Sequence, residues 1–259
     1  TAVTRKVIAH LPWFWGTVGV VGLVAVWQLV CTLFAVPVYL LPSPWATLTA
    51  LWADAAILGP HLATTAIEAF SGLALAVVFG VAAAVAMSAS RPSRDLLYPP
   101  LVLSQAVPLI AVAPLVLIWF GLGPSAKVLI VAFVCFFPIT VNAYEGFRTV
   151  DPLYLELLRT LGAQRRDVYR HLYLPATLPG ILAGLRVGAT YSVLGAVVGE
   201  WLGGSRGLGV YMIRALQSFR TDRLFAAIWI VMLMSLAMFK LVDGVGGRLT
   251  PWLRRRQRA

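Results

Sequence analysis

Long apolar stretches, separated by short polar segments, dominate the sequence. Six of these stretches come close to the roughly 20 residues that an α-helix needs to cross the hydrocarbon layer of a membrane. They predict transmembrane helices over residues 16–34, 61–90, 96–120, 127–144, 179–199 and 224–244. The chain is therefore expected to be an all-α polytopic membrane protein, with residues 1–259 forming one transmembrane domain.

Composition excludes several classes of protein. Hydrophobic residues make up 60% of the chain and charged residues 12%, whereas ordinary soluble domains have roughly 45–50% and about 25%. A soluble enzyme, a disordered chain and a fibrous protein are excluded on that ground. Cys31 and Cys135 both lie inside apolar runs, so the sequence predicts neither a disulfide framework nor a metal site.

The position of the basic residues explains the net charge of +11 without a nucleic acid. Fourteen Lys and Arg residues fall in the N-terminal tail, the loops after the second and fourth spans, and the C-terminal tail. The connecting segments on the other side hold five. Because Lys and Arg accumulate in cytoplasmic loops, both termini and the loop at 145–178 are expected in the cytoplasm.

That loop of residues 145–178 is too polar to lie in lipid, and it predicts two short helices, 154–161 and 165–172. Gly162 lies between them and can take the left-handed conformation that ends a helix. Leu157, Leu158 and Leu161 fall on one face of the first helix. An apolar face beside arginines predicts a docking element for another protein. An ordinary helical hairpin lying on the surface is the alternative.

The spacing within this loop is also specific. Glu156-Leu157-Leu158 is followed after three residues by Gly162, then by nine residues and by Leu172-Tyr173-Leu174-Pro175. This pattern resembles the EAA loop of binding-protein-dependent ABC importer permeases, with two leucines in place of the two alanines. The resemblance assigns coupling to an ATPase to these residues: Glu156, Leu157, Leu158, Gly162, Ala163, Leu172, Leu174 and Pro175.

Further segments extend this resemblance over about residues 37–252, and they look most like permeases for nitrate, sulfonates, taurine and vitamin precursors. They include Leu41-Pro42-Ser43-Pro44, Trp119-Phe120-Gly121-Leu122-Gly123 and Arg206-Gly207-Leu208-Gly209. The resemblance implies a type I ABC importer permease fold in a bacterial inner membrane. The implied solute is a small anion such as a sulfonate or nitrate, with a vitamin precursor as the second choice.

The resemblance also implies partners. These are a second permease copy forming a homodimer, two cytoplasmic ATPase subunits that use ATP and Mg, and an extracytoplasmic binding protein. No cofactor is expected in this chain itself, and it is not expected to be an enzyme. A phosphate-binding loop ends in Gly-Lys-Ser/Thr, but Lys6, Lys127 and Lys240 are the only lysines and none follows a glycine.

Polar or small residues inside the spans are candidates for the solute pathway or its gate, because polar groups are costly in lipid. They are Gln105, Asn142, Arg186, Gly188, Ser192 and Glu200. Structural roles are the alternative: hydrogen bonding between helices for the two amides, an ion pair for Arg186, and a helix cap for Glu200. The ridge of small residues from Gly180 to Ser192 indicates close helix packing, either within the chain or against the second copy.

A secondary transporter or channel without an ATPase partner is the other functional hypothesis. Such a protein would show an inverted repeat with broken helices, or carboxylates that couple ions near the middle of the membrane. The sequence shows no repeat, and the spaced loop at 145–178 favours the ABC permease instead.

Overall fold

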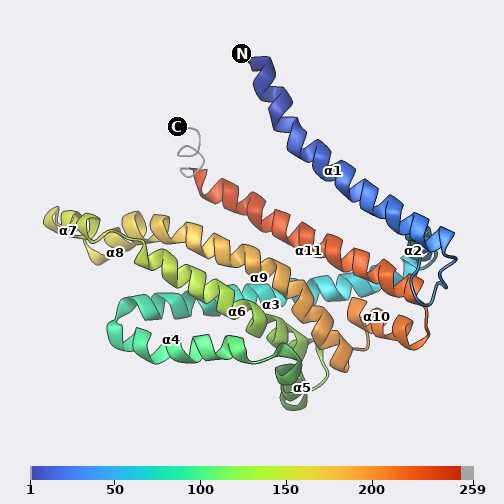
Figure 1. The fold of residues 1–259 in the computed structure, drawn as a ribbon. Coiled ribbons are helices and arrows are strands. Elements are labelled where there is room, and N and C mark those ends of the chain that lie inside the picture. The colour runs from blue at the N-terminus through green and yellow to red at the C-terminus, as the bar shows by residue number, and fades with distance from the viewer. Residues whose placement is uncertain (1, 252–259) are drawn as a thin grey trace. The chain divides into compact units, whose positions relative to one another are not determined.

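A computed structural model describes the backbone of residues 2–251 and the side chains of residues 15–251 (Figure 1). The side chains of Arg5 and Lys6 and the C-terminal arginines 254, 255, 256 and 258 lie outside the described residues. Every regular element in the described part is helical. The elements are α1 (Ala2–Leu33), α2 (Pro44–Ala53), α3 (Ala55–Ala89), α4 (Arg91–Ala106), α5 (Leu109–Phe120), α6 (Pro124–Arg148), α7 (Pro152–Thr160), α8 (Arg165–Val168), the π-helix η1 (Tyr169–Tyr173), α9 (Leu174–Gly203), α10 (Leu208–Gln217) and α11 (Thr221–Leu249).

Five helical stretches in the described residues are long and apolar enough to cross a membrane, and a bent pair of helices makes a sixth. This confirms the prediction of an all-α protein with about six spans. The fifth stretch is longer than predicted because α8, η1 and α9 continue without a break from Arg165 to Gly203.

The third predicted span, 96–120, is two helices rather than one. Helices α4 and α5 meet at an angle of 105°. Pro108 is the N-cap of α5, and Val107 before it has an extended backbone, with φ −80° and ψ 118°. A proline disfavours the helical conformation in the residue before it, so the helix ends there and a new one starts.

The chain forms two compact units. Within the described residues, the first comprises 2–59 and 211–229, and the second 60–210 and 230–251. In the first unit, Asp54 is the C-cap of α2, and its Oδ2 accepts hydrogen bonds from the Tyr211 hydroxyl at 2.6 Å and from Arg223 Nε at 2.9 Å. Burial and the bond to Asp54 raise the pKa of Tyr211 above its ordinary value, which keeps the hydroxyl a donor at neutral pH.

The second unit is built around the pair α6 and α9, which run side by side (Figure 1). Gly180 and Gly184 of α9 face the backbone of α6 directly. A Cβ added at Gly184 would lie 2.7 Å from the Pro138 carbonyl oxygen, and one at Gly180 would lie 2.5 Å from the Asn142 carbonyl oxygen. These two glycines therefore pack within the chain, which was one of the two alternatives for the small-residue ridge.

Other helices of the second unit pack around this pair. A continuous apolar core joins α3, α6, α9 and the end of α11, and includes Ala76, Ile139, Val193 and Met238. A second cluster joins α3, α4 and α6, and a third joins α5 to α6. Helix α6 thus contacts the most neighbours and fixes the position of both halves of the bent pair.

We predict that Gly184→Ala lowers the stability of the purified protein, because the new methyl group would clash with the α6 backbone. Unlike a side chain, that backbone cannot relieve the clash by changing rotamer. Overpacking of this kind costs about 1–3 kcal/mol. Thermal unfolding in detergent measures the effect. Gly244→Ala is the matched control, because a Cβ there meets nothing within 4 Å; equal melting temperatures for the two variants would contradict the prediction.

Candidate functional site

The loop after α6 folds into a short amphipathic helix, α7, that begins and ends as its sequence dictates. Asp151 is the N-cap, and its side chain accepts a hydrogen bond from the Leu153 N–H at 2.9 Å, while Pro152 takes the first helical position. The helix ends before Gly162, whose φ is +78°. The predicted break at Gly162 is thus confirmed, and Glu156, Leu157 and Leu158 lie on α7.

The second half of the loop starts with α8, which has a reciprocal capping box between Gln164 and Asp167. It then continues as the π-helix η1 directly into α9. Leu172 lies in η1, whereas Leu174 and Pro175 form the first turn of α9, and Ala163 lies in the turn after Gly162. The predicted coupling residues Leu172, Leu174 and Pro175 therefore belong to a helical stretch that is long enough to span a membrane.

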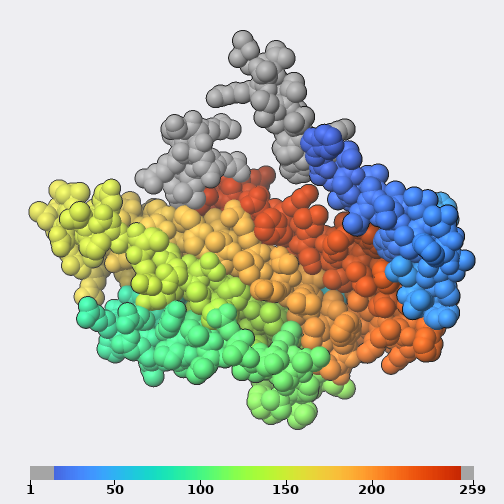
Figure 2. Space-filling model, viewed as in Figure 1, coloured from blue at the N-terminus to red at the C-terminus, as the bar shows by residue number. Residues whose placement is uncertain are grey.

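Helix α7 contains no buried residue. Leu153, Leu157 and Leu161 are 69%, 55% and 73% exposed. Figure 2 shows α7 and α8 at the surface, at one end of the second unit. Leu155 and Leu158 of α7 are half-buried. A short helix that leaves its other leucines exposed gains little from burial, so the loop has the chemistry of a docking surface.

A cavity of about 500 Å³ lies in the second unit, where the break between α4 and α5 faces α6 and α9. It brings together two of the predicted pathway residues, Gln105 at the end of α4 and Asn142 on α6. Tyr191 and Val187 of α9 close the opposite wall. The other lining residues are Ser104, Val107, Pro108, Leu109, Phe133, Val134, Phe137, Pro138 and Val141.

The polar groups of this cavity are all uncharged: two amides, the hydroxyls of Ser104 and Tyr191, and backbone carbonyls. The Asn142 amide nitrogen donates to the Pro138 carbonyl at 2.8 Å, which fixes the side chain and leaves its Oδ1 for a solute. The mixture of aromatic walls and a few oriented polar groups is typical of sites for small molecules.

The remaining pathway candidates lie outside this cavity. Arg186 is paired with Asp243 at 2.7 Å. The Ser192 hydroxyl is buried and donates to the Ala189 carbonyl at 2.9 Å. Gly188 faces Ile139 and Leu73 in the core. In each case the contacts observed are those of helix packing within one chain.

Glu200, near the end of α9, holds the segment after that helix. Its Oε1 accepts a hydrogen bond from the Thr65 hydroxyl at 2.7 Å, and its Oε2 accepts one from the Gly209 N–H at 2.6 Å. The Leu208 N–H in turn donates to the Thr65 oxygen at 2.8 Å. Gly207 has φ +128°, and a Cβ there would fall directly on the Glu200 carboxyl group.

A buried ion pair lies between α3 and α6. Lys127 Nζ is 3.1 Å from Glu68 Oε1, and the two side chains are 4% and 2% exposed. This pair was not predicted from the sequence. Charges of opposite sign in two different spans are the signal that could have suggested the pair.

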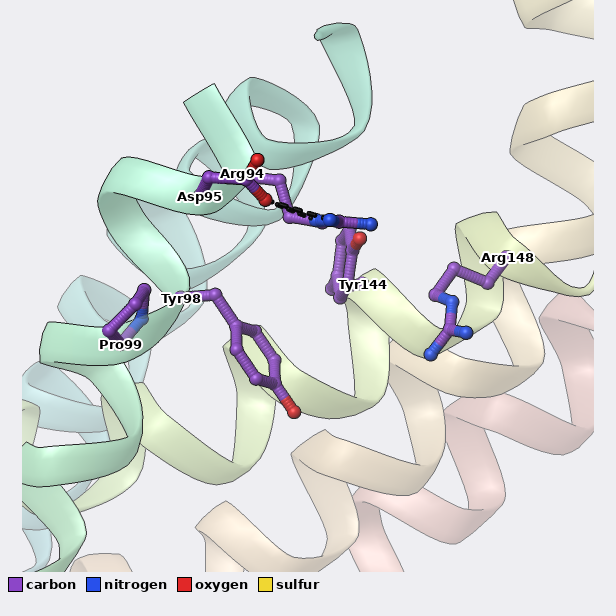
Figure 3. Close-up of a pocket in the computed structure, with 6 residues that line it drawn as sticks. All are labelled: Arg94, Asp95, Tyr98, Pro99, Tyr144 and Arg148. Atoms are coloured by element: carbon purple, nitrogen blue, oxygen red, sulfur yellow. Dashed lines mark hydrogen bonds and ion pairs between the residues drawn. The ribbon is translucent and has the colours of Figure 1, made fainter. Parts of the chain in front are cut away.

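A second, basic pocket of about 380 Å³ lies between the start of α4 and the end of α6 (Figure 3). Arg94 and Tyr98 come from α4, and Tyr144 and Arg148 from α6. Both arginines already have carboxylate partners: Arg94 contacts Asp95 at 2.7 Å, and Arg148 contacts Glu145 at 3.0 Å. The sequence analysis did not single out this pocket, nor the aromatic walls of the larger cavity, because both depend on which faces of α4 and α6 meet.

The family model described as "Binding-protein-dependent transport system inner membrane component" matches residues 76–255. The chain belongs to this family. It is a permease subunit of an ABC importer, and the all-helical architecture agrees with that interpretation. This result sets aside the alternative of a self-contained secondary transporter or channel.

Two relatives and one solved structure illustrate the similarity. A "Probable ABC transporter permease protein" of Haemophilus influenzae is 38% identical over 85% of this chain and 90% of its own length. The "Formylaminopyrimidine transport permease protein ThiX" of Halalkalibacterium halodurans is 35% identical over 89% of this chain and 92% of its own. The crystal structure of an amino acid ABC transporter superposes with a TM-score of 0.62 at 19% identity, over 78% of this chain and 97% of that one. The fold is thus that of type I importer permeases.

We predict that Gly207→Ala destabilises this permease, because a methyl group would displace the backbone from the Glu200 carboxyl group. Gly121→Ala is the control: φ there is +78° and ψ 178°, but a Cβ would meet nothing within 4 Å, so only the backbone strain of about 1–3 kcal/mol applies. Thermal unfolding in detergent should show a clearly larger loss for the first variant. A smaller or equal loss would mean that the segment does not depend on Glu200.

Proposed function

We propose that this permease carries a small, uncharged polar solute through the cavity at Gln105 and Asn142, and that the α7–α8 loop connects it to an ATPase. The solute assignment rests on one observation: polar, uncharged side chains from three helices line one cavity next to a broken span. Broken spans supply irregular backbone where a membrane protein needs a solute site.

The proposed partners follow from the uncovered loop. Glu156, Leu157, Leu158, Gly162, Ala163, Leu172, Leu174 and Pro175 contact the ATPase subunits. These subunits, not this chain, bind ATP and Mg and hydrolyse the nucleotide. A second permease copy completes the pathway, and a binding protein on the opposite side of a bacterial inner membrane delivers the solute. Both termini and the loop face the cytoplasm, in accord with the distribution of Lys and Arg.

Alternating access is the proposed mechanism. The ATPases bind the loop differently when closed on nucleotide and when open, and this difference in contact is what shifts the permease between its two states. Hydrolysis then returns the complex to the state that faces the cytoplasm.

The cavity also favours one of the two expected classes of solute. An anion without a compensating charge is costly to bury, and none of the side chains that line the cavity is charged. Arg186, which precedes the lining residue Val187, forms an ion pair with Asp243. A neutral vitamin precursor therefore fits better than a sulfonate or nitrate, which reverses the order expected from sequence. The similar permeases include one named for formylaminopyrimidine and one named for taurine, so this choice rests on the chemistry of the cavity and not on the similarity.

For the loop, we predict that Leu157→Asp reduces solute-stimulated ATP hydrolysis and uptake by about tenfold or more in proteoliposomes that contain the complete complex. The aspartate puts a charge into an apolar contact, whose desolvation costs several kcal/mol. Arg159→Asp is the control, because it introduces the same carboxylate about 200° further around α7.

Gly162→Pro tests the same loop independently. Proline fixes φ near −65° and cannot adopt the +78° found here, so coupling should fail although the apolar face of α7 is unchanged. Full coupling in both Leu157→Asp and Gly162→Pro would remove the loop from the mechanism.

For the cavity, we predict that Val187→Trp lowers uptake by about tenfold or more, because the indole fills space that the solute needs. Leu194→Trp, on the same helix but outside the lining residues, should leave uptake within about twofold. Formylaminopyrimidine and taurine are the probes, each measured with its binding protein present. Uptake of taurine but not of formylaminopyrimidine would contradict the proposed solute class, while unchanged uptake in Val187→Trp would contradict the proposed pathway.

A further inference from the structure

A third cavity lies beside the loop of residues 145–178, apart from the cavity proposed for the solute. Its volume is about 330 Å³. Helices α3, α6, α8 and α9 and the π-helix η1 all contribute to its walls, which consist of Val81, Val85, Phe147, Arg166, Tyr169, Arg170, Tyr173, Leu174, Thr177 and Ile181.

The two ends of this cavity differ in chemistry. Val81 and Val85 near the end of α3, with Ile181 of α9, form an aliphatic end, and all three lie on helical stretches apolar enough to span a membrane. Arg166 and Arg170 form the other end, on the loop side. The lining therefore combines aliphatic side chains of membrane-spanning helices with Arg166 and Arg170 of the loop.

An aromatic wall connects these ends. The rings of Phe147 and Tyr173 are 6.0 Å apart between centroids, and those of Tyr173 and Tyr169 are 5.2 Å apart. Tyr169 and Tyr173 are the first and last residues of η1. Short π-helical turns are rare and occur frequently at functional sites, and here the turn brings both tyrosines and Arg170 to the same cavity. Tyrosines are also enriched at the boundary between hydrocarbon and water.

The arginines of this cavity differ from those of the basic pocket in Figure 3. Arg94 and Arg148 are each paired with a neighbouring carboxylate. Among the described residues, no carboxylate lies within ion-pair distance of Arg166 or Arg170. Two unpaired guanidinium groups over an aliphatic floor have the charge and the apolar surface that an anionic amphiphile would complement.

We propose that this cavity binds an anionic phospholipid, with the headgroup phosphate on Arg166 and Arg170 and one acyl chain against Val81, Val85 and Ile181. Basic pockets between membrane helices on the cytoplasmic side bind such headgroups, and each Lys or Arg near the surface adds to the attraction. A guanidinium group also matches the oxygens of a phosphate better than an ammonium group does. A free phosphate ion would leave the aliphatic end of the cavity unused.

The site would place a lipid against η1, at the junction between the coupling loop and the membrane-spanning part of α9. Its occupancy would then favour the arrangement of the loop in which η1 and α3 remain together. This assignment uses the predicted cytoplasmic side of the loop, but it does not depend on which solute the permease carries.

Native mass spectrometry of the purified full-length permease in detergent tests the proposal, with phosphatidylglycerol and phosphatidylcholine of identical acyl chains as probes. We expect tighter binding of phosphatidylglycerol. The double variant Arg166→Gln/Arg170→Gln should weaken it by about tenfold or more. The matched control, Arg94→Gln/Arg148→Gln, removes the same charge and should change it by less than about twofold. Melting temperatures of both double variants check that they are folded.

Three further outcomes decide the nature of the ligand. Val85→Trp should weaken phosphatidylglycerol binding, because it fills the aliphatic end, and a variant that binds normally would overturn the assignment. Competition by inorganic phosphate at millimolar concentration would show a free-anion site and overturn the lipid. Equal binding of the two lipids, or equal losses in the two double variants, would overturn a specific headgroup site. Displacement of the lipid when the ATPase subunits assemble would show that the arginines serve the ATPase instead.

Discussion

The close approach of α9 to α6 at Gly180 and Gly184 is the constraint on which the second unit depends. Because these two glycines have no side chains, the backbone of α9 can lie against the carbonyl oxygens of Pro138 and Asn142. In lipid, such van der Waals contact largely replaces the hydrophobic effect as the source of helix association. This contact sets the register of α6 and α9, and each cavity described above is lined in part by one or both of these helices. Asn142 and Tyr191 meet across one cavity because of it, and the ends of the same helices carry the coupling loop.

Several ionisable side chains in the membrane-spanning helices of this unit have partners of their own, outside the cavity at Asn142. Glu68 is buried against Lys127, Arg186 is paired with Asp243, and Glu200 binds a hydroxyl and a backbone N–H. A buried charge that loses its partner is strongly destabilising, so these groups contribute to fixed helix positions. The cavity at Asn142 is left with amides, hydroxyls and rings, and its selectivity must come from hydrogen-bond geometry and shape.

Sequence alone predicted those features that depend on local pattern. Apolar length gave the spans, Gly162 ends α7 as predicted, and the spacing from Glu156 to Pro175 identified the loop. The start of α7 was predicted at residue 154, whereas Asp151-Pro152 begins the helix two residues earlier. The bend of the third span was not predicted, although Pro108 causes it. Prolines also occur inside helices of this chain that continue past them, such as Pro138 in α6, so a proline alone did not indicate a break. Length and hydropathy cannot distinguish a kink from a break.

Features that depend on which helix faces meet could not be predicted. The pairing of Glu68 with Lys127 joins residues from separate spans, and periodicity gives the face of a helix but not its neighbour. The same limit applies to the pathway candidates: Gln105 and Asn142 reach one cavity, whereas Ser192 and Gly188 do not, although all four looked equivalent as polar or small residues in apolar runs.

The continuity of α8, η1 and α9 has a mechanical consequence for coupling. A displacement of α8 acts on a helix that runs unbroken from Arg165 to Gly203. This helix passes the cavity at Val187 and Tyr191 and carries Glu200 in its last turn. Helix α7, by contrast, is joined to α8 through the turn at Gly162 and follows the end of α6, so it is not continuous with a membrane-spanning helix. Under the proposed function, the two halves of the loop therefore have different roles: α7 offers the apolar contact to the ATPase, and the continuous α8–η1–α9 helix connects that contact to the cavity walls. Packed helices shift as units rather than deforming continuously. A small displacement of η1 would therefore move Tyr191 by a similar distance.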